Sequence, residues 1–263
     1  GFNWVRNAIW GSPEARGNST TLTDNIIDTT GSTANIPYYI SMYSSIGCLV
    51  QDTLTYKINP TPVITDLNFY DTICSDVGIK AFTPKTQISS GVYMIWSAAT
   101  ATGLSGMTGG TYSVSNPVSK LGNFNQQKII NSTALPVSMT YSLTPIYPYN
   151  LTNNGAYCAA NSSIQYTVTV NPRPQLLTTQ TTVACSGTPF RYSPPTGVSG
   201  TNIIPASTVY SWTAPQYSDT ALLKGGSGLN RAAGEYVDAP ISQVLTNKGL
   251  VPQIATYNVY AKA

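Results

Sequence analysis

Histidine is absent from this 263-residue sequence, and charged residues make up only 9% of it. The lack of histidine excludes histidine-based catalytic triads and the common zinc, copper and non-haem iron sites. The ten acidic residues form no recognisable catalytic pair, so we expect a protein that is not an enzyme. The net charge of +3 is scattered without a run of Lys or Arg, which argues against nucleic acid as a partner.

Long apolar runs are also missing. No stretch of 18 apolar residues occurs, so we expect no membrane insertion, and the first residues show no secretion signal. The four cysteines, none of them in a CxxC pair, are Cys48, Cys74, Cys158 and Cys185. An even number of cysteines in a chain rich in Ser and Thr favours disulfides and an extracellular location, with buried free thiols as the alternative.

What the sequence does contain is a strong strand pattern. Residues 164–170 (IQYTVTV) alternate between β-branched or aromatic and polar side chains, and helical periodicity is almost absent. Glycine-rich clusters at 103–110 and 225–228 separate such runs and are typical of turns. The sequence therefore predicts an all-β protein.

Landmarks in the sequence recur at intervals of 110 to 112 residues. An Asn-Pro-x-Pro motif ends a strand at 59–62 and again at 171–174, and the cysteines repeat at nearly the same interval. We therefore expect the back part of a first repeat in residues 1–60, a complete repeat in 61–172, and a third repeat without its closing strand in 173–263. Because unpaired strand edges are avoided, we expect the polypeptide to continue in both directions or a partner strand to complete the ends.

The first and third repeats carry an aromatic-x-Trp strand, and the middle repeat has Met94-Ile95-Trp96, preceded by Tyr93, in its place. Further on, each repeat has a strand whose tyrosine lies 11 or 12 residues after an aliphatic residue. The aliphatic residue and the tyrosine are Ile27 and Tyr39 in the first repeat, Ile130 and Tyr141 in the second, and Leu245 and Tyr257 in the third. We align the three repeats on these pairs. Units of about 110 residues with about seven short strands predict tandem immunoglobulin-like β-sandwiches. The aromatic residues expected in the cores are Trp4, Trp96, Trp212, Tyr141 and Tyr257.

Two disulfide patterns are open. Cys74 can pair with Cys158 inside the complete repeat, leaving Cys48 and Cys185 to partners outside the sequence. Alternatively Cys48 pairs with Cys74 and Cys158 with Cys185, across the proline motifs. The second pattern joins residues on an extended path of about 3.3 Å per residue, while a disulfide needs Cα atoms within about 7 Å. We therefore favour the pair Cys74–Cys158.

The motifs of the third repeat resemble the PKD-like, immunoglobulin-like repeats of giant cell-surface adhesins of Bacteroidetes, of the SprB gliding-motility type. They are, in order, CSGTPF at 185–190, Tyr210-x-Trp212-x-x-Pro215, the glycines at 225–228, Ile241-x-x-x-Leu245-x-Asn247 and Ala255-x-Tyr257-x-Val259. The middle repeat is similar, although Asp76 stands where a glycine is expected. The resemblance covers most of residues 61–263 and only the back half of the first repeat.

The resemblance implies an adhesin exported by the type IX secretion system and displayed at the cell surface. Its expected partners are adjacent repeats of the same polypeptide, the secretion and motility machinery at the outer membrane, and a polysaccharide or solid surface. No catalytic residue belongs to such a repeat. Two alternatives stay open: a carbohydrate-binding accessory module of a secreted enzyme, and a filament subunit whose ends are completed by strands of neighbouring copies.

Three groups of residues are candidate sites. Threonines that follow aspartate resemble an O-glycosylation motif, with local turn formation as the alternative; they are Thr29, Thr53, Thr72 and Thr220. Asp66, Asp71 and Asp76 offer oxygen ligands for Ca²⁺, but their spacing matches no calcium loop, so we expect no cofactor. Tyr147 and Tyr149 lie in an insertion and are candidates for surface contact, with packing inside the loop as the alternative.

Overall fold

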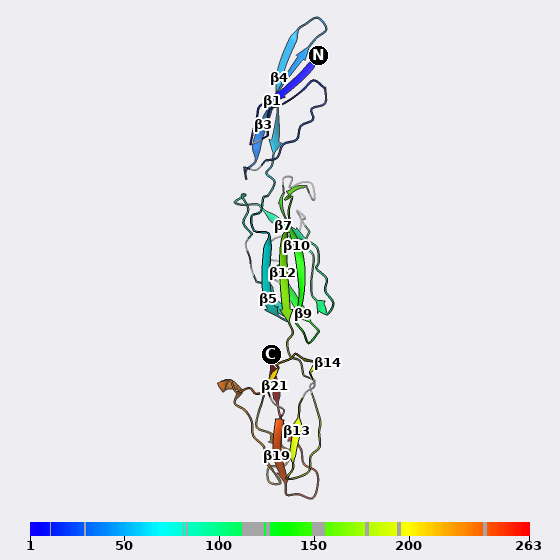
Figure 1. The fold of residues 1–263 in the computed structure, drawn as a ribbon, viewed down its shortest axis with the longest axis vertical. Coiled ribbons are helices and arrows are strands. Elements are labelled where there is room, and N and C mark those ends of the chain that lie inside the picture. Colours follow the sequence, from blue (N-terminus) through cyan, green and yellow to red (C-terminus); the bar gives the residue numbers. More distant parts are fainter. Residues whose placement is uncertain are drawn as a thin grey trace.

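The computed structural model describes residues 1–263 except 11, 29, 81, 83, 112–123, 125–126, 149–155, 177–178, 194–195 and 239–240. Strands dominate it, and the one helix of three or more residues in the described chain is the 3-10 turn η1 (Arg231–Ala233). No described helix is long and apolar enough to span a membrane. The predicted class, all-β with tandem β-sandwich repeats, is confirmed. Three bodies follow one another along the long axis of the molecule (Figure 1).

The first body, which we call the N-terminal sheet, is a four-stranded antiparallel sheet in the order β2-β1-β3-β4. Its strands are β1 (Phe2–Arg6), β2 (Ala15–Gly17), β3 (Ala34–Tyr43) and β4 (Leu49–Ile58). Trp4, Ile36 and Tyr38 form its core, against which loop residues such as Trp10 and Ile26 pack. The outer strand β4 pairs with β3 over ten residues and has no strand on its other side among the described residues.

The second body, the central sandwich, has two facing sheets. One has the order β11-β10-β12-β5, with β7 also paired to β10, and the other has the order β6-β9-β8. The strands are β5 (Asn68–Cys74), β6 (Val77–Gly78), β7 (Tyr93–Trp96), β8 (Leu104–Ser105), β9 (Lys128–Asn131), β10 (Val137–Pro148), β11 (Tyr157–Ala159) and β12 (Ile164–Asn171). β5 and β12 are parallel, whereas the other pairs are antiparallel.

The third body, the C-terminal sandwich, is built from shorter strands. They are β13 (Pro189–Tyr192), β14 (Gly197–Ser199), β15 (Asn202–Ile204), β16 (Val209–Trp212), β17 (Gln216–Tyr217), β18 (Leu223–Gly225), β19 (Ile241–Asn247), β20 (Ala255–Thr256) and β21 (Val259–Lys262). The pairings are β13-β19-β18, β16-β21, β17-β20 and β14-β15, all antiparallel. Ile204, Tyr210, Trp212 and Ile241 form its core.

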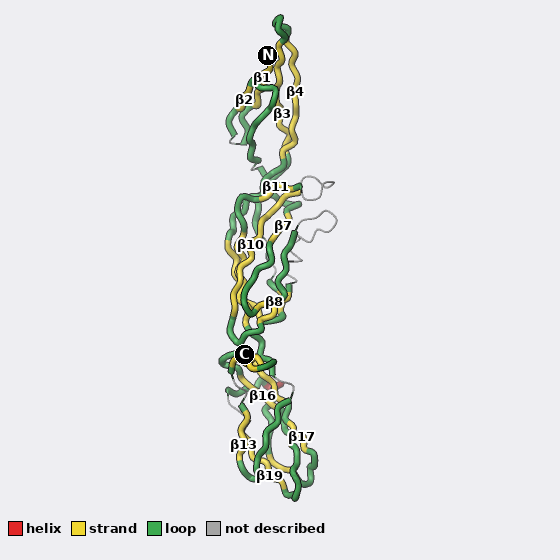
Figure 2. The backbone as a smooth tube through the Cα atoms, turned by 90° about the vertical axis from the view of Figure 1, so that its right-hand side faces the viewer, coloured by secondary structure: helices red, strands yellow, loops and turns green. Residues whose placement is uncertain are grey.

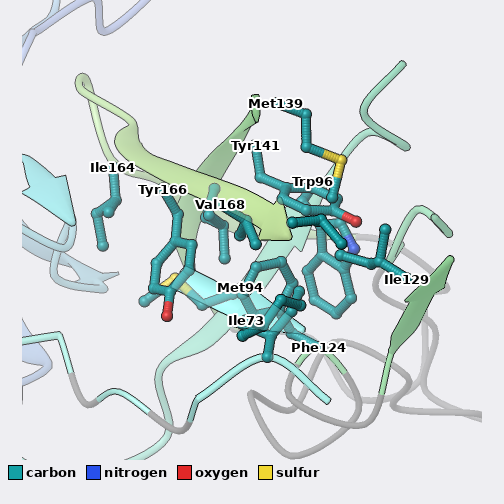
Figure 3. Packing of buried hydrophobic residues seen from close by; sticks show 13 residues of the cluster. Ile73, Met94, Trp96, Phe124, Ile129, Met139, Tyr141, Ile164, Tyr166 and Val168 are labelled. Atoms are coloured by element: carbon teal, nitrogen blue, oxygen red, sulfur yellow. The ribbon is translucent and has the colours of Figure 1, made fainter. Parts of the chain in front are cut away.

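Aromatic and aliphatic side chains fill the space between the two sheets of the central sandwich (Figure 3). The alternation along β12 buries Ile164, Tyr166, Val168 and Val170 and turns the polar residues outward. Trp96 is 5% exposed, and its indole N–H donates to the Thr108 carbonyl at 2.9 Å. Of the other aromatic residues expected in cores, Trp4, Trp212 and Tyr141 are buried and Tyr257 is half-buried.

The strand register relates the three bodies to one another. Each core tryptophan stands opposite a residue that follows a core tyrosine by two positions: Trp4 opposite Ile40, Trp96 opposite Leu143 and Trp212 opposite Val259. The tyrosine of the N-terminal sheet is therefore Tyr38, which is 3% exposed, and the sequence alignment on Tyr39, which is 47% exposed, is wrong by one residue. A slip of one residue moves a side chain to the opposite face of the sheet.

The aliphatic residues aligned with these tyrosines must also be moved by one position in the first two repeats. Ile27 and Ile130 are exposed, whereas Ile129 is completely buried and Ile26 packs against the core. With these corrections the aliphatic residue precedes its tyrosine by twelve positions in all three bodies, since Ile26 precedes Tyr38, Ile129 precedes Tyr141, and Leu245 precedes Tyr257.

Candidate functional site

The first junction, residues 59–62, is fixed by hydrogen bonds to both bodies that it joins. Pro60 and Pro62 are buried. The side chain of Gln87, from the central sandwich, donates to the Thr61 carbonyl at 2.7 Å and accepts from the Val63 N–H at 2.6 Å. The Thr61 N–H donates to the carbonyl of Asp28, from the N-terminal sheet, at 3.3 Å.

The two bodies also touch beside this junction. A Cβ added at Gly31, whose φ is +82°, would lie 2.6 Å from the Gln87 carbonyl oxygen. The loop of the N-terminal sheet therefore lies directly on the backbone of the central sandwich, and only a residue without a side chain fits there. The two prolines, the hydrogen bonds of the Gln87 amide and the backbone contact at Gly31 together make this connection stiff. Figure 2 shows that the connection between the two bodies is also short.

The second junction, residues 171–174, is held in a comparable way. The Ser75 N–H donates to the Asn171 carbonyl at 2.8 Å on the side of the central sandwich. Gln175 exchanges two backbone hydrogen bonds of 2.8 Å with Ile203 on the side of the C-terminal sandwich. Arg173 lies 3.9 Å from the Asp76 carboxylate. Both proline motifs thus continue into the next body without a free linker in the described chain.

A buried asparagine supports the end of the central sandwich next to the second junction. Asn131 is 1% exposed, and its Nδ2 donates to the carbonyls of Leu135 and Val170, both at 2.8 Å. Its Oδ1 accepts from the N–H and the hydroxyl of Thr133, also at 2.8 Å. Asn247 makes the same turn in the C-terminal sandwich, where its Nδ2 donates to Val251. Asn247 stands in one of the sequence motifs of the third repeat, but its role in this turn was not predicted.

Asp28 takes the corresponding place in the N-terminal sheet. Its Oδ1 accepts from the N–H and the hydroxyl of Thr30 at 2.8 and 2.7 Å, as Asn131 does from Thr133. The side chain is 1% exposed, yet its second oxygen, Oδ2, has no hydrogen-bond partner. A carboxylate cannot donate a hydrogen bond, so Asp28 makes neither of the two bonds that Asn131 Nδ2 donates to backbone carbonyls.

This difference predicts a stabilising substitution. We expect Asp28→Asn to raise the free energy of unfolding by about 1–2 kcal/mol, because it removes an unpaired buried oxygen and adds an N–H donor. Urea unfolding followed by hydrogen exchange of the β3 amides measures the change. The matched control is Asn131→Asp, which introduces the same defect into the central sandwich and should destabilise it; an equal loss of stability in both variants would contradict the prediction.

A buried ion pair between Arg6 and Asp24 contacts the core residue Tyr38 of the N-terminal sheet. Arg6 is 2% exposed; its Nε donates to Asp24 Oδ2 at 2.6 Å, and the Tyr38 hydroxyl donates to the same oxygen at 2.8 Å. The hydrogen bond from Arg6 lowers the pKa of Asp24 against the opposing effect of burial, and the bond from Tyr38 lowers it further. Burial, together with the Asp24 carboxylate, raises the pKa of Tyr38 to about 12. Sequence reasoning missed this group, because its members are far apart in the chain and share no motif.

The aspartates considered for Ca²⁺ do not meet. Asp71 is buried, and Lys80 holds it through its ammonium group and its backbone N–H, both at 2.9 Å. Burial by itself would raise the pKa of Asp71, but the hydrogen bonds and charge of Lys80 outweigh it and lower the pKa. Asp76 is exposed near Lys128 and Arg173. Among the described residues no group of three acids or cysteines is arranged to hold a metal ion.

Neither disulfide pattern is formed: all four thiols are free. Cys74 stands opposite Asn171 at the end of β12 that enters the second junction. Cys158 stands opposite Tyr147 at the other end of β10, near the first junction, where its thiol lies 3.8 Å from the Asn59 carbonyl. The two favoured partners therefore occupy opposite ends of one sheet, since the strands between them run its full length. Burial and the charge of Asp28 raise the pKa of the Cys158 thiol.

The described threonines of the Asp-Thr motif are all exposed: Thr53 on β4, Thr72 on β5 and Thr220 in a turn. Thr29 lies outside the described residues. The aspartates before Thr53 and Thr72 each accept a hydrogen bond from the next backbone N–H, at 2.7 and 2.8 Å. Asp219 accepts from the Ala221 N–H at 2.7 Å. In these motifs the aspartate therefore accepts a hydrogen bond from a nearby backbone N–H, while the threonine that follows it is exposed. O-glycosylation of these threonines stays a prediction.

Tyr147 is half-buried near the end of β10, and a Cβ added at Gly91 would lie 3.3 Å from its ring. It therefore packs over the neighbouring loop. Tyr149 lies outside the described residues. A pocket in the N-terminal sheet is lined by Ala8, Ile9, Trp10, Ser12 and Pro13 and has no titratable side chain.

No family model matches the sequence, and no curated protein matches it. Among solved structures, the chain is similar to the "Protocadherin gammaB7 EC3-6 cis-dimer structure", with a TM-score of 0.29 and 12% identity over 98% of this chain and 65% of that one. It is also similar to "Protocadherin Gamma B2 extracellular cadherin domains 3-6", with a TM-score of 0.27 and 10% identity over 98% of this chain and 61% of that one. The chain thus spans less than two thirds of either. At these TM-scores the similarity is too weak to transfer a fold or a function.

Proposed function

We propose that this chain is a structural and adhesive repeat segment of a large secreted cell-surface protein, of the kind that serves gliding motility and is exported by the type IX secretion system. It comprises the back part of a first repeat (1–60), a complete repeat (61–172) and a third repeat without its closing strand (173–263), and adjacent repeats of the same polypeptide are its first partners. The observation that carries the proposal is the pair of proline junctions, each hydrogen-bonded to the bodies on both sides. Such connections build a semi-rigid rod from small sandwiches.

The outer face of the central sandwich supports a role in contact. Hydroxyl groups pair across its strands, Ser138 with Thr169 at 2.8 Å and Thr140 with Thr167 at 2.9 Å. This face exposes neutral donors and acceptors, and Thr72 on β5 adds another accessible hydroxyl. A neutral, hydroxyl-rich face suits hydrogen bonding to polysaccharide or to a hydrated solid surface, and the low charge of the chain limits repulsion between neighbours.

Antibody labelling of the cells that make the protein tests this function. We expect antibodies against the 263-residue chain to label intact cells, and the label to disappear when the type IX secretion machinery is inactivated. Antibody fragments added to living cells should reduce their attachment to glass several-fold. Labelling only after lysis, or unchanged attachment of fully labelled cells, would reject the proposal; antibodies against a cytoplasmic protein are the control for lysis.

A further inference from the structure

The open edge of the N-terminal sheet exposes residues that the central sandwich buries. The register of β3 with β4 places Leu54 opposite Tyr38, just as Tyr166 on β12 stands opposite Tyr141. β4 therefore corresponds to β12. Yet Leu54 is 40% exposed, whereas Tyr166 is 3% exposed.

The contrast continues along the same strands. Tyr56, two residues further along β4, is 46% exposed, whereas Val168 on β12 is completely buried. Met42 and Val50, opposite each other on the same face of β3 and β4, are 41% and 58% exposed. An apolar strip of the inner face is thus uncovered. The strip leads to an edge whose only charged side chains are Asp52 and Lys57, with no proline or bulge to block pairing.

In the central sandwich the corresponding edge, that of β12, is covered by a parallel strand. β5 lies beside β12 in register from Asn68 opposite Gln165 to Cys74 opposite Asn171. Its inward side chains Asp71 and Ile73 are buried. The Gln165 N–H donates to the Leu67 carbonyl at 2.7 Å, which shows that odd-numbered residues of this segment direct their backbone groups toward β12.

The C-terminal sandwich contains the counterpart of β5, and it is unpaired. In the central sandwich the Asn131 N–H donates to the hydroxyl of Ser75, and in the C-terminal sandwich the Asn247 N–H donates to the hydroxyl of Ser186, at 3.0 and 2.9 Å. Ser186 thus corresponds to Ser75, and residues 179–185 (TQTTVAC) correspond to β5. Every one of these seven residues is exposed, Val183 to 94%, and no described strand pairs with them.

One molecule therefore carries both halves of a strand pair, at opposite ends of its long axis (Figure 1). We propose that residues 179–185 of one copy add to β4 of a second copy as a parallel strand. The register follows from β5 and β12: Cys185 lies beside Asn59, and Thr179 lies beside Thr53. The added segment has no charged residue, and its backbone satisfies the free donors and acceptors of the β4 edge.

This contact joins two different surfaces, so it is heterologous. Because the two surfaces lie at opposite ends of an elongated molecule and the added strand is parallel to β4, successive copies keep the same direction and build an open chain rather than a ring. Each added copy presents a new β4 edge at one end and a new free segment at the other. The product is an open, head-to-tail filament. The inference goes beyond the proposed function, because it concerns assembly between separate copies of the 263-residue chain. It applies where the β4 edge and residues 179–185 are not paired within one longer polypeptide, and it does not depend on display on cells.

Site-directed crosslinking of the 263-residue chain tests the register. Cys48, Cys74 and Cys158 are replaced by serine, and Asn59→Cys is added, so that each copy holds the introduced cysteine and Cys185. We expect diamide oxidation to give a ladder of disulfide-linked multimers on non-reducing gels. Thr53→Cys in the same background is the matched control, because it lies six residues along β4, about 20 Å from Cys185 in the proposed register, and should give at least about tenfold less product.

Proline substitutions test the strand itself. Thr182 corresponds to Asp71, whose N–H points toward β12, so Thr182→Pro removes a backbone donor from the pair and should abolish multimers in light scattering. Val183→Pro removes an N–H that points away and should leave assembly within about twofold of the original chain. Because the segment is exposed, neither variant should change the unfolding temperature of the isolated molecule.

Several outcomes would overturn the proposal. A chain that stays monomeric up to high micromolar concentration has no such contact. A ladder with Thr53→Cys in place of Asn59→Cys indicates antiparallel pairing. The Asn59→Cys variant could instead give only a dimer that is joined through the introduced cysteine of each copy. That result would indicate that β4 pairs with β4 of the second copy, which forms a closed dimer and leaves residues 179–185 unpaired.

Discussion

Replacing Asp24 by alanine is expected to lower the free energy of unfolding of the N-terminal sheet by about 3–5 kcal/mol, because it leaves the guanidinium of Arg6 buried without a counter-charge. The Tyr38 hydroxyl loses its acceptor at the same time. A loss of this size is enough to unfold so small a body locally. Hydrogen exchange of the β1 and β3 amides measures it, since exchange reports the opening of single regions.

The control for this variant is Glu14→Ala. Glu14 also pairs with an arginine, Arg16, but the two side chains are 44% and 75% exposed. Such surface pairs contribute about 0–1 kcal/mol, so exchange in β1 and β3 should hardly change. Equal effects of the two variants would contradict the assignment of Asp24 as the partner of a buried charge.

The same carboxylate predicts how the N-terminal sheet responds to acid. The pKa of Asp24 in the folded chain lies below its ordinary value of 3.8, so its ion pair contributes stability above that value. This contribution is lost as the pH falls below 3.8 and through the folded-state pKa. Exchange measured against pH should therefore rise in acid for the original chain and be flatter for Asp24→Ala.

The second large effect is expected for Trp96→Ala in the central sandwich, which should lose about 3–5 kcal/mol of unfolding free energy. The indole is 5% exposed and lies edge-on to Phe124, with ring centroids 5.4 Å apart. A Cβ added at Gly110 would lie 2.4 Å from the same ring, so the chain closes tightly around it. Its removal leaves a cavity that rigid strands on either side cannot fill.

Urea unfolding followed by near-ultraviolet circular dichroism measures the loss. Tyr70→Ala is the matched control: it removes an aromatic ring from β5 of the same sandwich, but from a position that is 78% exposed, and should change stability by less than about 0.5 kcal/mol. A small effect of Trp96→Ala would mean that Phe124 and its neighbours repack into the vacated space.

The sequence was sufficient to predict the all-β class, because alternation such as IQYTVTV in β12 depends only on local spacing. It did not fix the register of the N-terminal sheet. Tyr38 and Tyr39 are adjacent and identical, so only the pairing with β1 decides which of them enters the core. Asp76 illustrates a successful inference: it replaces an expected glycine and has a φ of +64°, close to the +78° of Gly187.

Contacts between residues that are far apart in the chain could not be predicted from the sequence. Arg6 and Asp24 carry no signal of burial, since both residue types are usually exposed. The role of Asp28 becomes visible only beside Asn131, which makes the same turn in another body. The disulfide between Cys74 and Cys158 was favoured because the alternative pairs are joined by an extended stretch of chain. The sequence did not show that Cys74 and Cys158 themselves lie at opposite ends of one sheet.

The parallel pairing of β5 with β12 determines how the central sandwich resists tension. The chain enters this body at the start of β5 and leaves it at the end of β12, and the two strands run side by side in the same direction. A pull along the long axis therefore draws the two strands past each other and loads all seven residue pairs of their register together. Hydrogen bonds in a hairpin pulled from its open end would instead break one after another. A tensile force on such a rod thus loads the complete repeat in shear, the direction in which a sheet yields least readily.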